Sequence, residues 1–204
     1  MPFQVLEKQQ LAQNVFSMWI EAPRIATKRK AGQFVIVRPA EHSERVPLTI
    51  AGVRPDTGAI RLIIQAVGKT TVELVALEPG ESVRDVAGPL GHPTQIDNYG
   101  VVLCIGGGIG VAPLLPIATA LKAAGNSVVS IIGARTKALL ILEDELREVS
   151  DELLVATDDG SYAHKGFVTD LLKERLTRAP AVNFAVTIVP VPMTRMMSII
   201  VSRT

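Results

Sequence analysis

Two patterns of apolar and polar residues follow one another along the chain and change near residue 98. In the first part, short apolar runs with strand-like composition alternate with turn residues. Six such runs cover residues 3–11, 14–22, 33–39, 47–53, 60–68 and 82–88. Turn-forming residues separate them, among them Ala31-Gly32, Pro79-Gly80 and a hairpin turn predicted over residues 55–58. This spacing predicts an antiparallel six-stranded β-barrel.

In the second part, apolar strands alternate with helices. Strands are predicted over residues 101–106, 127–135, 152–159 and 184–189, and helices over residues 111–124, 139–149 and 166–176. This alternation is typical of a doubly wound parallel sheet covered by helices. We therefore expect two domains, residues 1–97 and 98–204, joined at residues 97–100. The last stretch, residues 189–204, has no recognisable helix cap, and we expect the second domain to be incomplete at this end.

A glycine cluster lies between the strand at residues 101–106 and the helix that follows it. It contains Gly106, Gly107, Gly108 and Gly110, and Pro113 falls in the first turn of the helix. Glycines let backbone N–H groups approach a pyrophosphate, and a helix N-terminus adds a favourable dipole and unpaired donors. The segment therefore predicts a dinucleotide site. It is a variant of the usual G-x-G-x-x-G fingerprint, because Val111 stands where the third glycine would be.

The same segment allows another interpretation. Residues 101–121 carry no charge, and about 20 apolar residues can span a bilayer. Four clustered glycines together with Pro113 and Pro116 disfavour a membrane helix, because both residue types are poor helix formers.

Composition limits the function classes. Lys and Arg number 21 against 20 Asp and Glu, giving a net charge of +1, and no basic block points to nucleic acid. The one cysteine, Cys104, excludes an intramolecular disulfide and is expected to be a buried structural thiol. No apolar core follows a basic flank at the N-terminus, so we expect a cytoplasmic protein. No G-x-S-x-G elbow or metal-ligand cluster indicates a hydrolase.

The segment RVPLTI at residues 45–50, together with the glycine cluster, resembles the ferredoxin–NADP reductase superfamily. Within it, the chain is most similar to the electron-transfer subunits of dihydroorotate dehydrogenase and to the small subunit of NADH-dependent reduced ferredoxin:NADP oxidoreductase. The resemblance covers nearly the whole chain. It implies an FAD-binding barrel followed by a domain that binds a nicotinamide nucleotide.

The resemblance implies two flavin-binding segments in the first domain. Arg45, Pro47, Leu48 and Thr49 match the Arg-x-Pro strand that holds the flavin, where an arginine can pair with a phosphate and a threonine hydroxyl can bond the ring edge. The second segment runs into a helix start, where the FAD pyrophosphate would lie. Its candidate residues are Gln65, Gly68, Thr70 and Thr71. On the residues alone, this segment is also an ordinary strand-to-helix turn with a threonine cap.

In the second domain the resemblance places the nicotinamide nucleotide over the glycine cluster and Pro113. Arg135 either contacts a phosphate or pairs with Glu143 or Asp144. Asp158 and Asp159 stand where members that prefer NADP carry a serine and an arginine. Two carboxylates would repel a 2′-phosphate and suit a ribose diol, which favours NADH over NADPH, although acidic turns also cap helices.

Two departures from the relatives stand out. Val189-Pro190 replaces the Gly-Pro that usually ends the last strand. The relatives also continue into a cysteine-rich domain with a [2Fe–2S] cluster, whose thiolate ligands a chain with one cysteine cannot supply. From its end at residue 204 we expect a shortened or truncated member.

The function that these segments indicate is an FAD-dependent electron-transfer subunit. It would pass reducing equivalents between NAD(H) and a larger flavoprotein subunit, and the cofactors would supply the chemistry, so no catalytic side chain is expected. The alternative is a flavin- or nucleotide-binding partner, or a truncated chain, without turnover.

Overall fold

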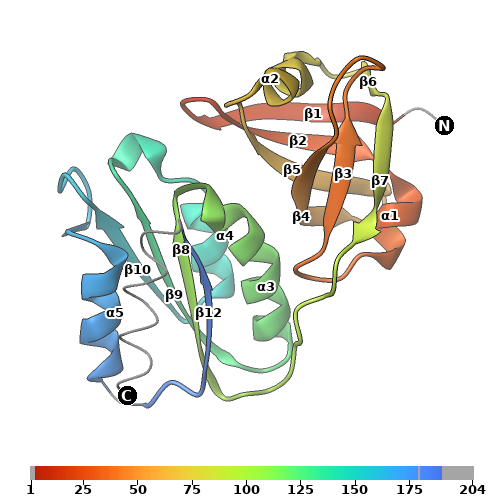
Figure 1. Cartoon of the computed structure of the whole chain (residues 1–204). Helices are drawn as coiled ribbons and strands as arrows, with labels where there is room; N and C mark the ends of the chain where they lie inside the picture. Colours follow the sequence, from red (N-terminus) through yellow and green to blue (C-terminus); the bar gives the residue numbers. More distant parts are fainter. Residues whose placement is uncertain (1–2, 179, 190–204) are drawn as a thin grey trace. The chain divides into compact units, whose positions relative to one another are not determined.

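The computed structural model describes residues 3–178 and 180–189. Its internal contacts divide the chain into two compact units, Met1–Thr94 and Gln95–Thr204. The first unit is built on an antiparallel sheet and the second on a parallel one (Figure 1). The predicted fold class, a barrel followed by a parallel-sheet domain, is confirmed.

The first unit is a nearly closed barrel (Figure 1). Seven strands form it in the part that the structure describes, in the order β6-β1-β2-β5-β4-β3-β7. Their bounds are β1 Phe3–Ala12, β2 Val15–Glu21, β3 Phe34–Arg38, β4 Val46–Arg54, β5 Ala59–Gln65, β6 Ser82–Val83 and β7 Asp85–Leu90. The barrel interior is filled by large aliphatic side chains, including Met18, Ile20, Ile50 and Leu62, which are fully buried.

The strand predicted over residues 82–88 is two strands. β6 pairs with β1, whereas β7 pairs with β3 on the other edge of the sheet. Arg84 lies between them and donates its backbone N–H to the carbonyl of Pro39 at 3.0 Å. The chain therefore changes partner strand within one apolar run, which explains why seven strands replace the expected six.

Two short helices and one tight turn complete the first unit. The helices are α1 Pro23–Lys28 and α2 Lys69–Ala76. The predicted hairpin turn at residues 55–58 joins β4 to β5, which pair in antiparallel register from Arg54 and Ala59. Gly58 closes it with a φ of 64°, a left-handed conformation that glycine adopts without strain.

The second unit is a parallel five-stranded sheet in the order β11-β10-β9-β8-β12. Its strands are β8 Val101–Gly107, β9 Ser127–Ala134, β10 Glu152–Thr157, β11 His164–Lys165 and β12 Phe184–Ile188, and its helices are α3 Val111–Ala123, α4 Glu143–Val149 and α5 Val168–Leu176. The chain moves outward from β8 to β11 and returns to place β12 on the other side of β8. The strand order therefore reverses between β8 and β12, and ligands bind such sheets at the carboxyl ends beside this switch point.

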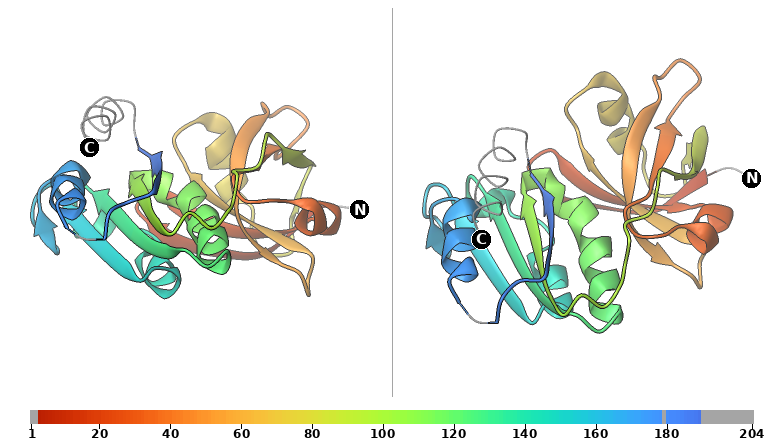
Figure 2. Two further views of the ribbon diagram at one scale, coloured as in Figure 1. Left: turned by 90° about the horizontal axis from the view of Figure 1, so that it is seen from below. Right: turned by 60° about the horizontal axis from the view of Figure 1, so that its bottom comes forward.

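Helices cover both faces of this sheet (Figure 2). A Cβ added at Gly106 would lie 3.1 Å from the side chain of Leu114 on α3, and one added at Gly133 would lie 2.5 Å from Val168 on α5. Gly133 pairs with Gly107, the residue after Gly106, and successive strand residues point to opposite faces. α3 and α5 therefore pack on opposite sides, as in a doubly wound sheet.

The helix predicted over residues 139–149 starts four residues late. Residues Lys137–Leu139 form a short 3-10 turn, and α4 begins only at Glu143. Leu142 has a φ of 58°, which is outside the right-handed helical region. The apolar run before Glu143 has the pattern of a first helical turn, but it forms a loop in which Leu142 is buried.

Asn126 clamps the entry to the second unit. Its side chain is almost fully buried and its Oδ1 accepts hydrogen bonds from the N–H groups of Tyr99 and Gly100. Its Nδ2 donates to the carbonyls of Asp97 and Leu121, both at 2.8 Å. One amide thus fixes the segment that leads into β8 against the end of α3.

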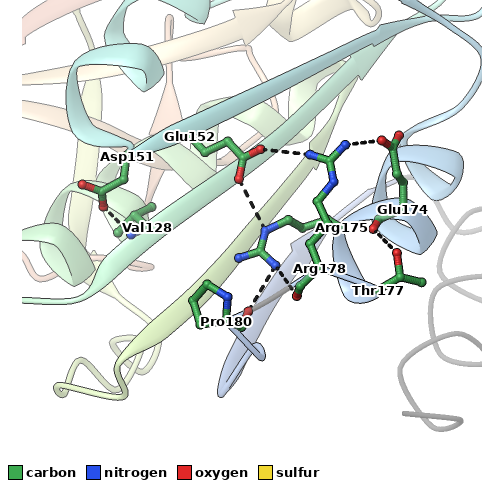
Figure 3. Close-up of polar contacts among 8 residues, drawn as sticks. All are labelled: Val128, Asp151, Glu152, Glu174, Arg175, Thr177, Arg178 and Pro180. Atoms are coloured by element: carbon green, nitrogen blue, oxygen red, sulfur yellow. Dashed lines mark hydrogen bonds and ion pairs between the residues drawn. The ribbon is translucent and has the colours of Figure 1, made fainter.

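Arg175 anchors the end of α5 (Figure 3). Its side chain is only 4% exposed, and its Nε lies 3.4 Å from the Glu152 carboxylate at the start of β10. Its guanidinium also donates to the carbonyls of Arg178 and Pro180, each at 3.3 Å. Buried guanidinium groups need such partners, because an unpaired buried charge is costly.

We predict that Arg175→Ala destabilises the chain far more than Arg178→Ala. The first change removes the buried partner of Glu152 and leaves two carbonyls without their donor, so it should lower the free energy of unfolding by about 3 kcal/mol. Arg178 pairs with Glu152 and Glu174 but is half exposed, and an exposed ion pair contributes roughly 0–1 kcal/mol. Urea denaturation of the two variants measures the difference. Equal losses would contradict the anchoring role.

Candidate cofactor sites

The glycine cluster forms the turn between β8 and α3. Gly106 and Gly107 end the strand, residues Gly108–Gly110 form a 3-10 turn, and Pro113 lies half-buried in the first turn of α3. The segment once open to a membrane interpretation is therefore a strand, a turn and a helix. In the residues that the structure describes, no helix is long and apolar enough to cross a membrane.

The glycines of this turn differ in what surrounds them. A Cβ at Gly110 would lie 2.3 Å from the carbonyl oxygen of Ile188 on β12, so only glycine fits there. Gly106 has less severe crowding, since a Cβ there would lie 3.1 Å from Leu114 and Val111 of α3. Gly108 has a φ of 54°, and a Cβ there would have no atom within 4 Å. Packing thus requires glycine at Gly110 and favours a small residue at Gly106, whereas Gly108 faces open space.

The carboxyl edge of the parallel sheet brings together Arg135, Asp158 and Asp159. Arg135 follows β9, and both aspartates follow β10, whose register matches β9 up to Ala134 and Thr157. The N–H of Asp159 donates to the carbonyl of Arg135 at 3.2 Å. The three residues predicted from separate segments are therefore neighbours at one edge.

The two aspartates are not equivalent. Asp159 Oδ1 accepts the N–H of Ser161 at 2.9 Å, and hydrogen bonds from Ser161 hold the pKa of Asp159 below its usual value. Asp158 is exposed, and its carboxylate has no hydrogen bond or ion pair within the described residues. Asp159 therefore shapes the turn, while Asp158 is available to a ligand.

Arg135 does not form the ion pair that was its alternative role. Glu143 instead accepts hydrogen bonds from Arg147 at 2.6 Å and from the Tyr162 hydroxyl at 3.0 Å. In the part of the chain that the structure describes, Arg135 pairs with neither Glu143 nor Asp144, and its side chain is exposed. The guanidinium is thus free to meet an anion.

Phe167 is a residue of this edge that the sequence interpretation missed. It is 53% exposed, immediately before α5. Thr157 on β10 pairs with Lys165, so Phe167 follows β11 at the same end of the sheet as the aspartates. A lone phenylalanine just before an amphipathic helix looks like a core residue in sequence, and only its exposure identifies it.

In the first unit, the segment at residues 45–49 divides between two faces. Val46 and Leu48 pack against the barrel core, whereas Pro47 is exposed. Alternation along β4 places Thr49 on the same side as Pro47. Leu48, predicted to meet the flavin, therefore supports the strand from inside, and Pro47 and Thr49 present the outer face.

Arg45 precedes β4 and is held by Asp85 on β7. The guanidinium lies 3.7 Å from the Asp85 carboxylate and is 61% exposed. The same carboxylate oxygen accepts the Nε–H of Arg38 at 2.7 Å. Asp85 thus lies beside Arg45 and leaves its guanidinium exposed.

The turn into α2 gathers the second set of candidates. The N-cap of α2 is Gly68, and Thr71 at the third helical position bonds back to it: Thr71 Oγ1 accepts the N–H groups of Gly68 and Val67 at 3.0 and 3.1 Å and donates to the carbonyl of Gly68. Thr70 is buried, whereas Gln65 is exposed at the end of β5. A Cβ at Gly68 would have no atom within 4 Å.

Two exposed valines flank this turn. Val67 is 77% exposed, just before Gly68, and Val72 is about half exposed on α2. They are among the few large aliphatic side chains exposed in the described residues. The sequence interpretation did not single them out, because valines at the end of a strand and within a helix read as core.

Two sequence observations lie partly or wholly outside the described residues. Val189 packs against the cluster around Leu103 and Ile105, but Pro190 is beyond the described range. The departure at Val189-Pro190 and the stretch that follows it therefore stay sequence observations. Among the residues that are described, no group of three or more His, Cys, Asp or Glu could hold a metal ion.

Solved structures identify the class of fold. A structure of NADH-dependent reduced ferredoxin-NADP oxidoreductase aligns with a TM-score of 0.91 and 42% identity over 99% of this chain and 72% of that chain. Phthalate dioxygenase reductase shares the fold alone, with a TM-score of 0.79 at 17% identity over 99% of this chain and 64% of that chain. The chain is thus a ferredoxin reductase-like protein, as the sequence resemblance predicted.

Curated sequences narrow the assignment. The dihydroorotate dehydrogenase B electron transfer subunit homolog of Thermotoga maritima is 49% identical over 169 residues, 83% of this chain and 60% of that protein. The electron transfer subunit of Geobacillus thermodenitrificans is 36% identical over 177 residues, 84% of this chain and 68% of that protein. No protein-family model matches. The chain belongs to the dihydroorotate dehydrogenase B electron transfer subunit family, and it spans about 60% of the length of the Thermotoga relative.

Cys104 lies in the middle of β8 and is fully buried. Burial raises its pKa from 9.0 to about 12, because the charged thiolate is poorly solvated there. A thiol held in its protonated form is a poor nucleophile. This agrees with the expected structural role.

We predict that Cys104 resists alkylation by iodoacetamide at pH 8 in the native chain and reacts after unfolding in urea. Because the native thiol keeps its proton up to about pH 12 while the unfolded one ionises near 9.0, stability should fall as the pH rises between these values. Mass spectrometry of the alkylated chain and urea denaturation at several pH values measure both effects. Rapid alkylation of native protein would contradict the burial.

Proposed function

We propose that this chain is an electron-transfer flavoprotein subunit. It binds FAD on the first unit and NADH at the carboxyl edge of the second, and it passes electrons to a partner oxidoreductase subunit. The names of its relatives support flavin-linked electron transfer, and the NADH step and the partner are our inference. The residues expected to hold each cofactor lie within the corresponding unit.

The observation that carries this proposal is a pair of open glycines, each in a turn that leads into a helix. Gly68 is the N-cap of α2, Gly108 opens the 3-10 turn before α3, and a Cβ at either would meet no atom within 4 Å. Helix N-termini attract phosphate through unpaired N–H groups and the helix dipole. The chain therefore offers one open, phosphate-compatible turn in each unit, which fits two dinucleotides.

In the first unit, Arg45 would pair with a phosphate of FAD, because its guanidinium is exposed and lies beside Asp85. The Thr49 hydroxyl and the backbone of Pro47 would hydrogen-bond the flavin edge. The second set, Gln65, Gly68, Thr70 and Thr71, would line the pyrophosphate, chiefly through backbone N–H groups since the Thr71 hydroxyl already bonds back to Gly68. Val67 and Val72 would shield this end from water.

In the second unit, Gly107 and Gly108 would lie against the NADH pyrophosphate, and Gly106, Gly110 and Pro113 would shape the turn. Arg135 would contact a phosphate. The free carboxylate of Asp158 would accept hydrogen bonds from a ribose diol and repel a 2′-phosphate. Phe167 offers an exposed ring on which an adenine can stack.

When bound, the nicotinamide supplies a hydride and the flavin accepts it. The residues of the chain bind, orient and exclude water, and we assign no general acid or base among them. A [2Fe–2S] cluster does not fit this chain, because such clusters are held by several thiolates and Cys104 is single and buried. No electron path through a cluster is proposed.

The test is an anaerobic absorbance spectrum of the full chain, recorded before and after adding NADH or NADPH. A flavin spectrum bleached by NADH, and less by NADPH, is the expected result. A flavin spectrum that neither nucleotide changes would favour a binding partner without turnover. Protein that takes up no FAD on reconstitution would overturn the proposal.

We predict that Asp158→Ser reduces the preference for NADH over NADPH roughly tenfold, because it removes the unpaired carboxylate that opposes a 2′-phosphate. Asp159→Asn is the matched control, since that carboxylate already bonds Ser161 and its loss should weaken both nucleotides alike. Dissociation constants for the two nucleotides, from fluorescence titration, give the ratio. An equal change of ratio in both variants would contradict the assignment.

A further inference from the structure

One carboxylate joins the two candidate flavin-binding segments of the first unit. Glu73 lies on α2, one turn from the helix start, and its Oε2 accepts the hydroxyl proton of Ser43 at 2.6 Å. Its Oε1 lies 3.7 Å from His42 Nε2 and 4.0 Å from Lys69 Nζ. Glu73 thus contacts both the loop that leads to Arg45 and the first turn of α2.

The loop at residues 39–45 depends on Ser43 for its shape. The N–H of Ser43 donates to the carbonyl of Ala40 at 3.1 Å, and the N–H of Ala40 donates back to Ser43 Oγ at 3.2 Å. The hydroxyl therefore accepts from its own loop and donates to α2. Ser43 is buried and Glu73 is partly exposed, so this hydrogen bond lies at the edge of the interior of the unit.

Two carboxylates hold this loop from two sides. Asp85 on β7 binds Arg38 and lies beside Arg45. In the described residues, every hydrogen bond and ion pair between the loop and α2 ends on Glu73. The polar connection of Arg45 to the start of α2 therefore passes through a single side chain.

The hydrogen bond between Ser43 and Glu73 is charge-assisted. A hydrogen bond from a hydroxyl to a carboxylate is shorter and stronger than one between two neutral groups. The Ser43 hydrogen bond, with the charges of His42 and Lys69, holds the pKa of Glu73 below its usual value, so the group is charged at neutral pH. Its side chain is 26% exposed, and His42 and Lys69 are mostly exposed, so these ion pairs add little to global stability.

We propose that Glu73 is a positioning residue for FAD. It fixes the spacing between Arg45 and the N-terminus of α2, the two groups that would each bind phosphate of the same ligand. The proposal rests on the function proposed above. Preorganisation of this kind raises affinity because the groups need not be ordered when the ligand binds.

The test measures the dissociation constant of FAD for the apo form of the full chain by quenching of flavin fluorescence. Glu73→Ala should raise this constant roughly tenfold, as expected for loss of a hydrogen bond to a charged group. Ser43→Ala should have a similar effect, and the double variant should be no worse than either, because both remove the same tie. Glu73→Gln should retain most of the affinity, since its amide oxygen still accepts from Ser43.

The matched control is Glu41→Gln, which removes a charge from the same loop. The Glu41 side chain is exposed and forms no hydrogen bond or ion pair in the described residues, so FAD binding should not change. The thermal midpoint of each apoprotein should stay within a few degrees of the wild type. This second readout separates positioning from a general loss of fold.

Three results would overturn the proposal: wild-type affinity in Glu73→Ala, additive effects in the double variant, or a loss of affinity that simply follows a loss of thermal stability. A wild-type chain that binds no FAD is a different outcome. It would overturn the proposed function itself, and with it the role of Glu73.

Discussion

The close approach of α3 and β12 at the carboxyl end of β8 is the constraint on which the second unit depends. It is possible only because Gly110 has no Cβ, which would otherwise meet the Ile188 carbonyl at 2.3 Å. This contact lies where the strand order reverses, so the same glycine that lets β12 join the sheet also sets the path of the turn before α3. Packing therefore fixes the turn first, and Gly108 is left facing open space as a result.

In the first unit, charged side chains rather than glycines hold the candidate segments in place. Strand pairing joins β4 to β5, which ends at Gln65, but α2 belongs to no sheet and needs side-chain contacts to reach the segment around Arg45. Asp85 and Glu73 hold the loop at residues 39–45, which leads into β4, by hydrogen bonds and ion pairs. Both carboxylates also contact residues that are largely exposed, so the polar groups are ordered while the ligand face stays accessible.

Local pattern was enough to predict much of this fold. Barrel strands, the hairpin at residues 55–58, the parallel sheet and α3 follow from alternation, turn chemistry and helix periodicity, which act over short distances. The split at Arg84 was not predictable in this way, because it reflects a change of partner strand within one run of residues. The late start of α4 depends on Leu142 in the left-handed region, a conformation that the sequence pattern does not predict.

The candidate sites were less predictable from the sequence than the fold. Motif matching could nominate Leu48 and both aspartates but could not tell that Leu48 packs inward or that Asp159 is already bonded to Ser161. Phe167 and Val67 were missed because exposure, not residue type, distinguishes them. Which face a side chain takes, and whether its polar atoms are already used, are properties of the tertiary structure.

Asn126 ties the C-terminal end of α3 to the segment that enters the second unit. The helix, about 20 Å long at 1.5 Å per residue, is gripped at one end by the amide that holds residues 97–100 and bears at the other on the glycine-rich turn. α3 therefore spans the second unit from the segment that enters it to the turn where the nucleotide is proposed to lie.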